Sequence, residues 1–420
     1  MSKLDLFNNF PNVNRQDWQS LVEKGLKGAA IESLIKTTDD ALTRGPLFTQ
    51  DDRPDAVAPL ARSATPLLDG RPWHIAAIAR QSDINLANQQ ILEDLSGGAS
   101  AVRLTLGTNG IKAQSHNDIK RLFDKVHTNL IPIIIAPNND IENQHLFHAY
   151  HNTHLYLGLG PKTDGLNELL QNCPKTWQLI TIRASRVHNT GGTDAQELAY
   201  FAASAAYAFR HLGKNAARHI GVELTTDQDG HMSIAKLRAA RRIYARIADS
   251  FGVDNAPLCL HAVSSNRMMQ STDPWTNMLR TMSAGFGAVI GGADFISLRP
   301  FTDAHDIQDT RETTPFSCRI ARNMQLMMME ESHLGQVQDA AFGSYFHERM
   351  TESLAQAAWT EFQQIEQDGG IDNIGPFKAR VKTAKDIRLQ KNTPILGVNL
   401  HPIDKNSSAF RDTKIKGPQS

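Results

Sequence analysis

The sequence predicts an α/β protein, a (β/α)8 TIM barrel with an N-terminal extension and a C-terminal helical extension. Eight short apolar or β-branched runs alternate with longer amphipathic segments between residues 73 and 300, and eight parallel strands close a barrel of this kind. The chain has 420 residues, whereas such a barrel uses about 250. The surplus residues are therefore assigned to extensions at both ends.

The predicted strands are residues 73–79, 101–106, 131–136, 155–158, 177–185, 220–225, 257–263 and 295–300. An amphipathic helix follows the first strand and stops at the glycine pair 97–98. Further helices are predicted over 194–212 and 234–251, and their lengths suit right-handed crossovers between parallel strands. Strand and helix thus alternate as a barrel requires.

Three parts of the chain are predicted: an N-terminal extension over 1–70 that contacts another subunit, a barrel over 71–335, and a C-terminal helical extension with a truncated linker over 336–420. The first part holds a helix around 18–34 and then an irregular, proline-containing run. An amphipathic helix over 315–333 contains three consecutive methionines, which we interpret as core packing. The last part holds a long helix around 350–367 and a lysine-rich tail.

Composition excludes several classes of protein. Lys and Arg number 44 and Asp and Glu number 44, so the formal net charge is zero and a nucleic-acid partner is not expected. No secretory signal and no apolar run long enough for a membrane span is visible, so a membrane partner is not expected either. Three widely spaced cysteines predict neither a disulfide framework nor a zinc site, and they indicate a reducing, cytoplasmic compartment.

Polar residues occupy one parity of several predicted strands, while the other parity is apolar. In a barrel the apolar parity packs against the helices and the polar parity faces the interior. The resulting interior set is Arg103, Arg183, Glu223, His261 and Arg299. These residues either bind the carboxylate or phosphate of an acyl-CoA substrate, or form a buried, hydrogen-bonded plug in a barrel that admits no ligand.

Other candidate sites are weaker. His145, His148, His151 and His154 recur every three residues, but no carboxylate or cysteine completes a metal site, so no metal is predicted. The pair Gly158 and Gly160 could present backbone N–H groups to a phosphate, and the pair at 285 and 287 is interpreted as close helix packing.

Several blocks of unusual sequence run along the chain. They are Gly45-Pro-Leu-Phe-Thr49, Gly70-Arg-Pro-Trp73, and residues 271–281, 291–294, 319–326, 330–335, 339–345, 358–366 with 369–370, and 394–399. Together they resemble the methylmalonyl-CoA mutase family of adenosylcobalamin-dependent acyl-CoA mutases over essentially the whole chain. The resemblance implies a barrel that threads CoA along its axis and faces a cobalamin domain, with the cofactor supplying the radical chemistry.

The chain departs from the catalytic members of that family in four respects. Ile78 stands where the catalytic chains have the tyrosine over cobalamin, and Val187-His188 stands where they have a Tyr-His pair, so only His188 is retained as a residual catalytic match. No counterpart of their Thr-Ile-Gln-Asn-Asp stretch is found. The Asp-x-His-x-x-Gly motif that ligates cobalt is also missing from this sequence.

The resemblance is closest to the noncatalytic small (β) subunit. The spacing from His188 to residues 196–198 is two residues shorter than in catalytic chains and is similar to that of the small subunit. The resemblance implies a small-subunit-like component of a heterodimeric methylmalonyl-CoA mutase, which isomerises succinyl-CoA and methylmalonyl-CoA in propionate metabolism. This chain would bind no cofactor, and adenosylcobalamin would lie in the catalytic large subunit. The alternatives are the barrel of a split cobalamin-dependent mutase, with Arg103, Arg183, His188 and His261 handling the substrate, and an acyl-CoA-binding protein without turnover.

Overall fold

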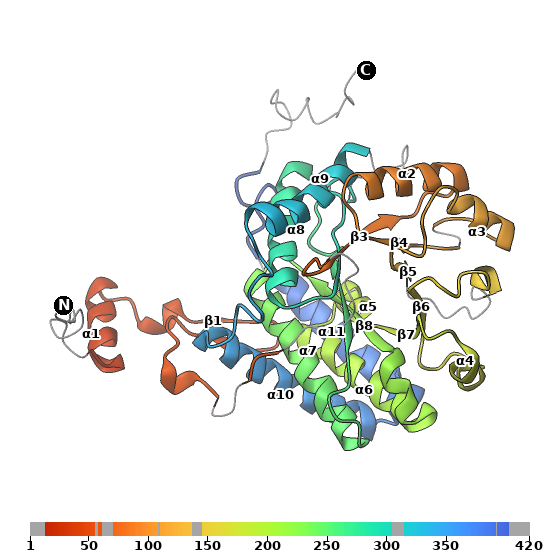
Figure 1. The fold of residues 1–420 in the computed structure, drawn as a ribbon. Coiled ribbons are helices and arrows are strands. Elements are labelled where there is room, and N and C mark those ends of the chain that lie inside the picture. The colour runs from red at the N-terminus through yellow and green to blue at the C-terminus, as the bar shows by residue number, and fades with distance from the viewer. Residues whose placement is uncertain are drawn as a thin grey trace, which may run out of the picture.

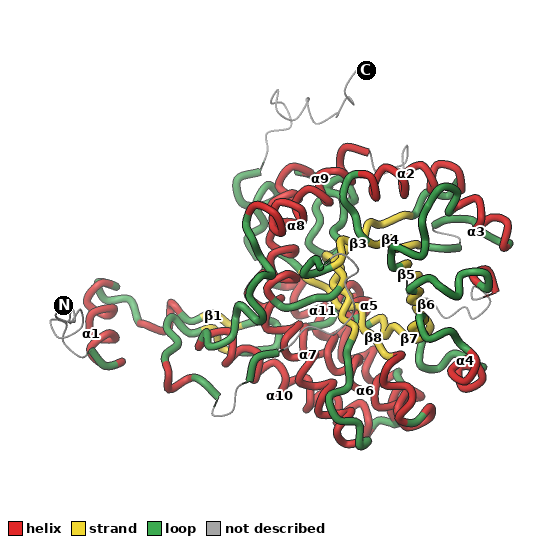
Figure 2. Tube along the Cα trace, viewed as in Figure 1, coloured by secondary structure: helices red, strands yellow, loops and turns green. Residues whose placement is uncertain are grey.

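Eight parallel strands form a closed barrel in the computed structural model, which describes residues 13–54, 58–60, 70–107, 110–136, 145–304, 315–391 and 393–402. The predicted (β/α)8 barrel is confirmed. Neighbouring strands follow the order β10-β3-β4-β5-β6-β7-β8-β9. Their bounds are β3 His74–Ala79, β4 Ala101–Leu104, β5 Ile133–Ile135, β6 Leu155–Leu159, β7 Trp177–Arg183, β8 Ile220–Thr226, β9 Cys259–Ser264 and β10 Phe295–Ser297. Figure 2 shows these strands inside a layer of helices.

The covering helices predicted over 194–212 and 234–251 are both present. The longest covering helices are α6 (Asp194–Leu212) and α7 (Gly230–Ser250), and α6 has the predicted bounds, although α7 begins four residues earlier and ends one residue earlier than the predicted 234–251. Thr193 and Gln196 form a capping box at the start of α6, and Gly213, with a φ of 71°, ends it. The other covering helices are α2 (Ile84–Ser96), α3 (His116–Leu122), α4 (Leu166–Asn172), α5 (Ser185–Thr190), α8 (Pro274–Ile290) and α9 (Pro315–Leu326).

The predicted alternation along the strands is seen in the packing. Val102 and Leu104 of β4 belong to the large core between strands and helices, whereas the residue between them, Arg103, faces the barrel interior, where it pairs with Glu223. A second, smaller cluster consists of interior residues from six strands: Ala76, Ala101, Ile134, Tyr156, Cys259 and Phe295. Thr225, near the end of β8, departs from this alternation. It has the same parity as Glu223, but its backbone N–H and its hydroxyl both donate to Glu197 of α6.

The N-terminal extension forms an arm, defined here as residues 13–44, that projects from the barrel in Figure 1. The single helix predicted around 18–34 is wrong: α1 (Arg15–Gly25) ends early, and a separate 3-10 turn follows at Ile31–Leu34. Lys27 and Gly28 have φ values of 50° and 99°, and a helix cannot continue through left-handed residues. A two-stranded hairpin, β1 (Lys36–Thr37) with β2 (Thr43–Arg44), completes the arm.

The C-terminal part contains one helix that the sequence analysis missed. α10 (Tyr345–Gln367) is the predicted long helix, but α11 (Gly375–Gln390) occupies part of the predicted tail. The signal in α11 is weak because only Phe377 and Val381 are buried. The predicted 315–333 helix changes at its end into a π-helical turn, Met327–Glu331, in which Met328 and Met329 are buried. The lysine-rich end beyond residue 402 lies outside the described residues, as do residues 1–12.

None of the described helices is long and apolar enough to cross a membrane.

Candidate functional site in the barrel interior

An ion pair spans the barrel interior. The Nη2 of Arg103 on β4 donates to Oε2 of Glu223 on β8 at 2.6 Å, and these strands lie on opposite sides of the closed sheet. Ser185 donates its hydroxyl to the other carboxylate oxygen of Glu223 at 2.5 Å. Burial opposes ionisation of Glu223, but the adjacent Arg103 charge outweighs it and lowers the pKa of that carboxyl to about 2. The charge of Arg103 is thus held by a residue of the same chain.

His261 lies beside this ion pair on β9. Its Nε2 is 3.0 Å from Oγ of Ser297, and that hydroxyl donates to the backbone oxygen of Ala76 at 2.8 Å. Since the hydroxyl has one proton, Nε2 must be the donor to it, which places the proton of a neutral ring on Nε2. Burial and the nearby Arg103 charge lower the pKa of His261 to about 3. The ring is therefore neutral at neutral pH.

The other two predicted interior arginines lie at the mouth of the barrel. Arg299 follows β10 and binds residues near the strand ends. Its Nε donates to the backbone oxygen of Ser264 at 3.1 Å, and its Nη1 donates to Asp303 at 2.8 Å. Arg183 is exposed at the end of β7. The structure thus brings together Arg103, Glu223 and His261 and leaves Arg183 and Arg299 outside that group.

An aromatic layer crosses the interior on the N-terminal side of the ion pair. The ring of Phe295 stacks on His74 with centroids 4.8 Å apart and meets the edge of Tyr156 at 4.9 Å. Between β7 and β8, Gln178 packs directly over Gly221, where a Cβ would clash with its amide. The sequence analysis missed this layer, although Phe295 and Tyr156 fall on the interior parity of their strands.

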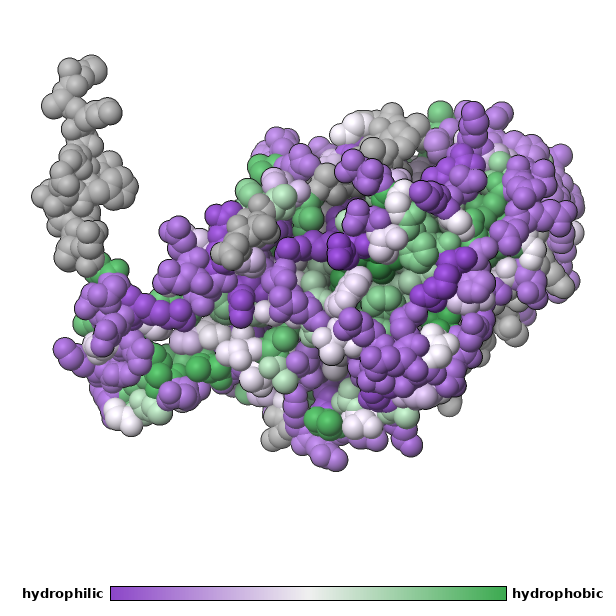
Figure 3. Space-filling view, turned by 90° about the horizontal axis from the view of Figure 1, so that it is seen from below, coloured by the Kyte–Doolittle hydropathy of each residue, from purple (hydrophilic) through white to green (hydrophobic). Residues whose placement is uncertain are grey.

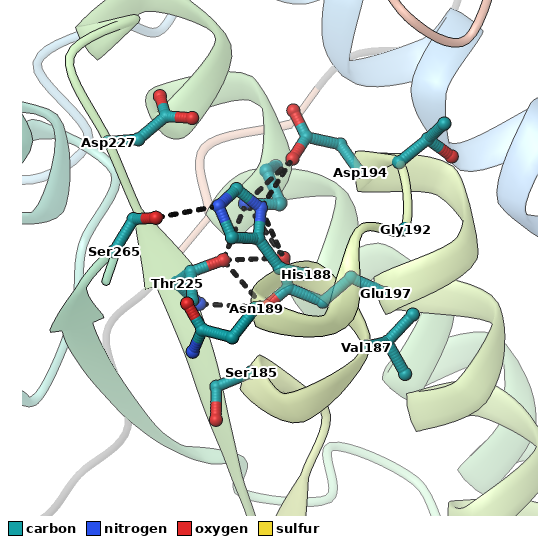
Figure 4. Close-up of polar contacts among 12 residues, drawn as sticks. Ser185, Val187, His188, Asn189, Gly192, Asp194, Glu197, Thr225, Asp227 and Ser265 are labelled. Atoms are coloured by element: carbon teal, nitrogen blue, oxygen red, sulfur yellow. Dashed lines mark hydrogen bonds and ion pairs between the residues drawn. The ribbon is translucent and has the colours of Figure 1, made fainter. Parts of the chain in front are cut away.

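His188 lies in a second polar cluster at the C-terminal end of the strands (Figure 4). The side chain is fully buried, with Nε2 2.9 Å from Oγ of Ser265. Its Nδ1 is 3.8 Å from Oδ1 of Asp194 and 3.7 Å from Oε2 of Glu197. Burial lowers the pKa of His188. Its sequence neighbour Val187 is also buried.

His188, Asp194 and Glu197 have side chains of the types that bind metals. Among the described residues they form the only group of three or more that could hold a metal ion. A cation from the chain already lies between the two carboxylates. Nζ of Lys236 on α7 is 2.7 Å from Asp194 and 2.8 Å from Glu197. Despite burial, these carboxylates raise the pKa of Lys236, and Lys236 lowers the pKa of Asp194. The ammonium thus takes the place that a metal ion would need.

The remaining sequence candidates do not gather into a site. His145, His148 and His151 are exposed, and His151 stacks on Trp177. Gly287 of α8 packs so closely on α7 that an added Cβ would lie 2.8 Å from the Cβ of Ser233, which confirms the packing interpretation of the glycine pair. Cys173, Cys259 and Cys318 are free thiols.

Comparison with known proteins decides the family. Residues 162–414 match the family described as methylmalonyl-CoA mutase. The chain is 33% identical to the methylmalonyl-CoA mutase small subunit of Streptomyces virginiae, across 95% of this chain and 72% of that protein. The chain belongs to the methylmalonyl-CoA mutase family.

Other relatives extend this result. The small subunit of Propionibacterium freudenreichii subsp. shermanii is 30% identical across 88% of this chain and 64% of its own length. A protein of Rhizobium meliloti named methylmalonyl-CoA mutase is 26% identical across 96% of this chain and 67% of its own length. The chain thus spans about two thirds of the length of these curated relatives.

The adenosylcobalamin implied by the methylmalonyl-CoA mutase family does not fit the two histidines of this site. His188 and His261 are both at least 97% buried, Nε2 of each contacts a serine hydroxyl, and Nδ1 of each is buried as well, so no ring nitrogen of either is exposed to cobalt. Ile78, which the resemblance places at the position of the catalytic tyrosine, is aliphatic and lies near the end of β3. No step of a reaction is therefore assigned to these residues.

Proposed function

We propose that this chain is the small, structural subunit of a heterodimeric methylmalonyl-CoA mutase, inactive alone and required by a catalytic large subunit that holds adenosylcobalamin. Succinyl-CoA and methylmalonyl-CoA would be the acyl-CoA pair that the complex isomerises in propionate metabolism. The observation that carries the proposal is the filled barrel interior, where the Phe295 layer and the Arg103–Glu223 ion pair lie one above the other.

A substrate threaded along the axis would have to displace both parts of this interior. Phe295 is 1% exposed and Tyr156 is 8% exposed, and they contact each other edge to face. Separating Arg103 from Glu223 would leave a buried charge unpaired, which typically costs about 3–5 kcal/mol. These contacts favour the plug interpretation of Arg103, Glu223 and His261 over substrate binding.

The arm supports a protein partner. None of the 11 residues of α1 is buried, and an isolated helix of that length is marginally stable in water. Leu21 is 64% exposed, and Leu34 and Ile35 are also exposed. Figure 3, in which the arm lies at the left, shows apolar residues along its surface. Exposed apolar side chains on an arm with little packing of its own are typical of a segment that is buried in a complex.

The test of the partner is co-expression of this chain with the catalytic large subunit, followed by gel filtration and a mutase assay. The expected result is a 1:1 complex with activity that neither chain has alone. Leu21→Glu is expected to weaken the complex at least about tenfold, because it places a charge in an apolar contact. The matched control is Gln19→Glu on the same helix. Independent elution of the wild-type chains would overturn the proposal.

A second test addresses the interior. Titration calorimetry of the purified chain with succinyl-CoA and with CoA is expected to show no saturable heat. Saturable binding without turnover would contradict the plug and favour an acyl-CoA-binding protein. Binding with turnover in the presence of a separate cobalamin protein would favour the split mutase.

A further inference from the structure

A cavity of about 910 Å³ lies outside the barrel interior, at the C-terminal ends of β8 and β9. The β1–β2 hairpin of the arm and the C-terminal segment 393–399 form two of its walls. Four arginines line it: Arg44 on β2, Arg267 after β9, Arg280 on α8 and Arg388 on α11. Segments from both ends of the chain therefore enclose a space with basic side chains.

Two of these arginines donate hydrogen bonds to the backbone of one turn, residues 188–192. Nη1 of Arg267 donates to the backbone oxygens of His188 and Gly192, at 3.2 and 3.0 Å, and Nη1 of Arg388 donates to the backbone oxygen of Gly191 at 2.8 Å. The two guanidinium groups thus bind adjacent carbonyl groups. Burial and the proximity of Arg267 lower the pKa of Arg388. Asp39 opposes this shift, but it makes no ion pair with Arg388.

Most other arginines with little exposure are paired differently, and an exception is Arg280, which donates to Asn277 and to the backbone oxygen of Leu396. The paired arginines each bind a carboxylate: Arg103 with Glu223, Arg238 with Asp339 and Glu348, Arg241 with Asp294, Arg299 with Asp303, and Arg322 with Asp94. Among the described residues, Arg267 and Arg388 have no carboxylate within ion-pair distance, and their Nη2 and Nε atoms have no hydrogen-bond acceptor. Their remaining donors are available to a ligand.

The acidic residues of the cavity do not neutralise this pair. Asp39 binds Lys391 at 2.9 Å, Asp229 binds Arg44, and Asp194 binds Lys236 at 2.7 Å. Burial and repulsion by Asp194 raise the pKa of Asp40 to about 7, and burial also raises the pKa of Asp227. Neither Arg267 nor Arg388 is among the cations that these carboxylates bind.

We propose that Arg267 and Arg388 bind the phosphoryl group of an organic phosphate monoester in this cavity. A phosphate monoester carries a charge of about −1.5 to −2 at pH 7, which matches two guanidinium groups, and its oxygens suit the planar donor fork of arginine. The apolar part of the ligand lies against Met232, Leu279 and Leu396, which line the same cavity. Binding ties α11 to the turn that carries His188.

The experiment is titration calorimetry of the isolated full-length chain with phenyl phosphate, with inorganic phosphate and with benzoate, at constant ionic strength. Phenyl phosphate is expected to bind with a Kd below about 1 mM and to bind more tightly than either other probe. Arg267→Gln and Arg388→Gln are each expected to weaken it at least about tenfold. Circular dichroism checks that both variants fold.

The matched control is Arg246→Gln, which removes the same charge from α7, where Arg246 is well exposed and has only Asp249 beside it at 3.5 Å. Its affinity is expected to equal that of the wild type. No saturable heat with phenyl phosphate, or an equal loss in Arg246→Gln, would overturn the site. Equal binding of inorganic phosphate would overturn the role of the apolar wall. The test needs no partner subunit, so its result is independent of the proposed heterodimer.

Discussion

Nζ of Lys236 donates to Oε2 of Glu197 at 2.8 Å, and both side chains are almost completely buried. The same ammonium also binds Asp194, so one cation compensates two carboxylates where α6 and α7 meet the end of β8. His188 lies within 4 Å of both carboxylates. The ammonium of Lys236 thus occupies a set of side chains that could bind a metal ion. Removal of this lysine tests that interpretation.

Lys236→Ala is expected to lower the free energy of unfolding by about 3–5 kcal/mol, because it leaves buried carboxylates uncompensated. It should also create a binding site for Zn²⁺ at His188, Asp194 and Glu197. Urea unfolding with and without Zn²⁺ measures both effects. Lys391→Ala is the control, since its ion pair with Asp39 is half exposed and should contribute less than about 1 kcal/mol. Equal Zn²⁺ affinity of wild type and Lys236→Ala would contradict this account.

Breaking the ion pair inside the barrel should be costly, whereas replacing it need not be. Glu223→Gln leaves Arg103 charged and buried, and it should lose about 3–5 kcal/mol in urea unfolding. The double variant Arg103→Met with Glu223→Leu should recover much of that loss. Arg15→Gln, which removes an exposed ion pair with Asp52, serves as the control and should change stability by less than about 1 kcal/mol. A double variant no more stable than Glu223→Gln would argue against the pair as the cause.

Acid should destabilise the fold through His261. Its pKa is about 3 in the folded chain against an ordinary value of 6.5, so between these values only the unfolded state takes up the proton and stability falls as pH falls. Glu223, at about 2 against 4.5, acts in the same direction at lower pH. Asp40, at about 7 against 3.8, acts in the opposite direction.

The contribution of His261 is therefore measured as a difference. Between about pH 7 and pH 4, wild type should lose about 3 kcal/mol more than His261→Gln. Urea unfolding at a series of pH values gives both curves. His151→Gln, at an exposed position, should follow the wild-type curve. Parallel curves for wild type and His261→Gln would show that this ring does not titrate as described.

Close packing of α8 on α7 predicts a third kind of effect. Gly287→Ala places a methyl group 2.8 Å from the Cβ of Ser233 and 2.9 Å from the backbone oxygen of Gly230, so it should destabilise the fold by about 1–3 kcal/mol. Gly25→Ala is the matched control because nothing lies within 4 Å of its added methyl group. It should be neutral or slightly stabilising. Thermal unfolding of the two variants makes the comparison, and equal midpoints would refute it.

The sequence predicted the barrel well because its signals are local. Strand runs such as Ile220–Thr226 and the capped helix Asp194–Leu212 carry their own periodicity and stop residues. The break after α1 depends on the left-handed conformation of Lys27 and Gly28, and the predicted 18–34 helix runs through this glycine although glycine is a local stop signal. α11 was missed because few of its residues are buried.

The site was less predictable than the fold. The parity of the strands placed Arg103, Glu223 and His261 in the interior, but which arginine pairs with which carboxylate depends on distances across the barrel. Arg183 has the same parity as these residues and is exposed, because it lies at the strand end. Lys236 could not be found from sequence, because its partners Asp194 and Glu197 lie on another helix.

The hydroxyl of Ser297 binds the backbone oxygen of Ala76 across a separation of 221 residues, at the seam where β10 pairs with β3. The barrel can close only after both strands have left the ribosome, so during synthesis one edge of β3 stays unpaired until β10 has been made. Contacts this distant in sequence slow folding, and unpaired edges invite association with other chains. The edge of β3 is therefore open to association with other chains until the eighth strand arrives.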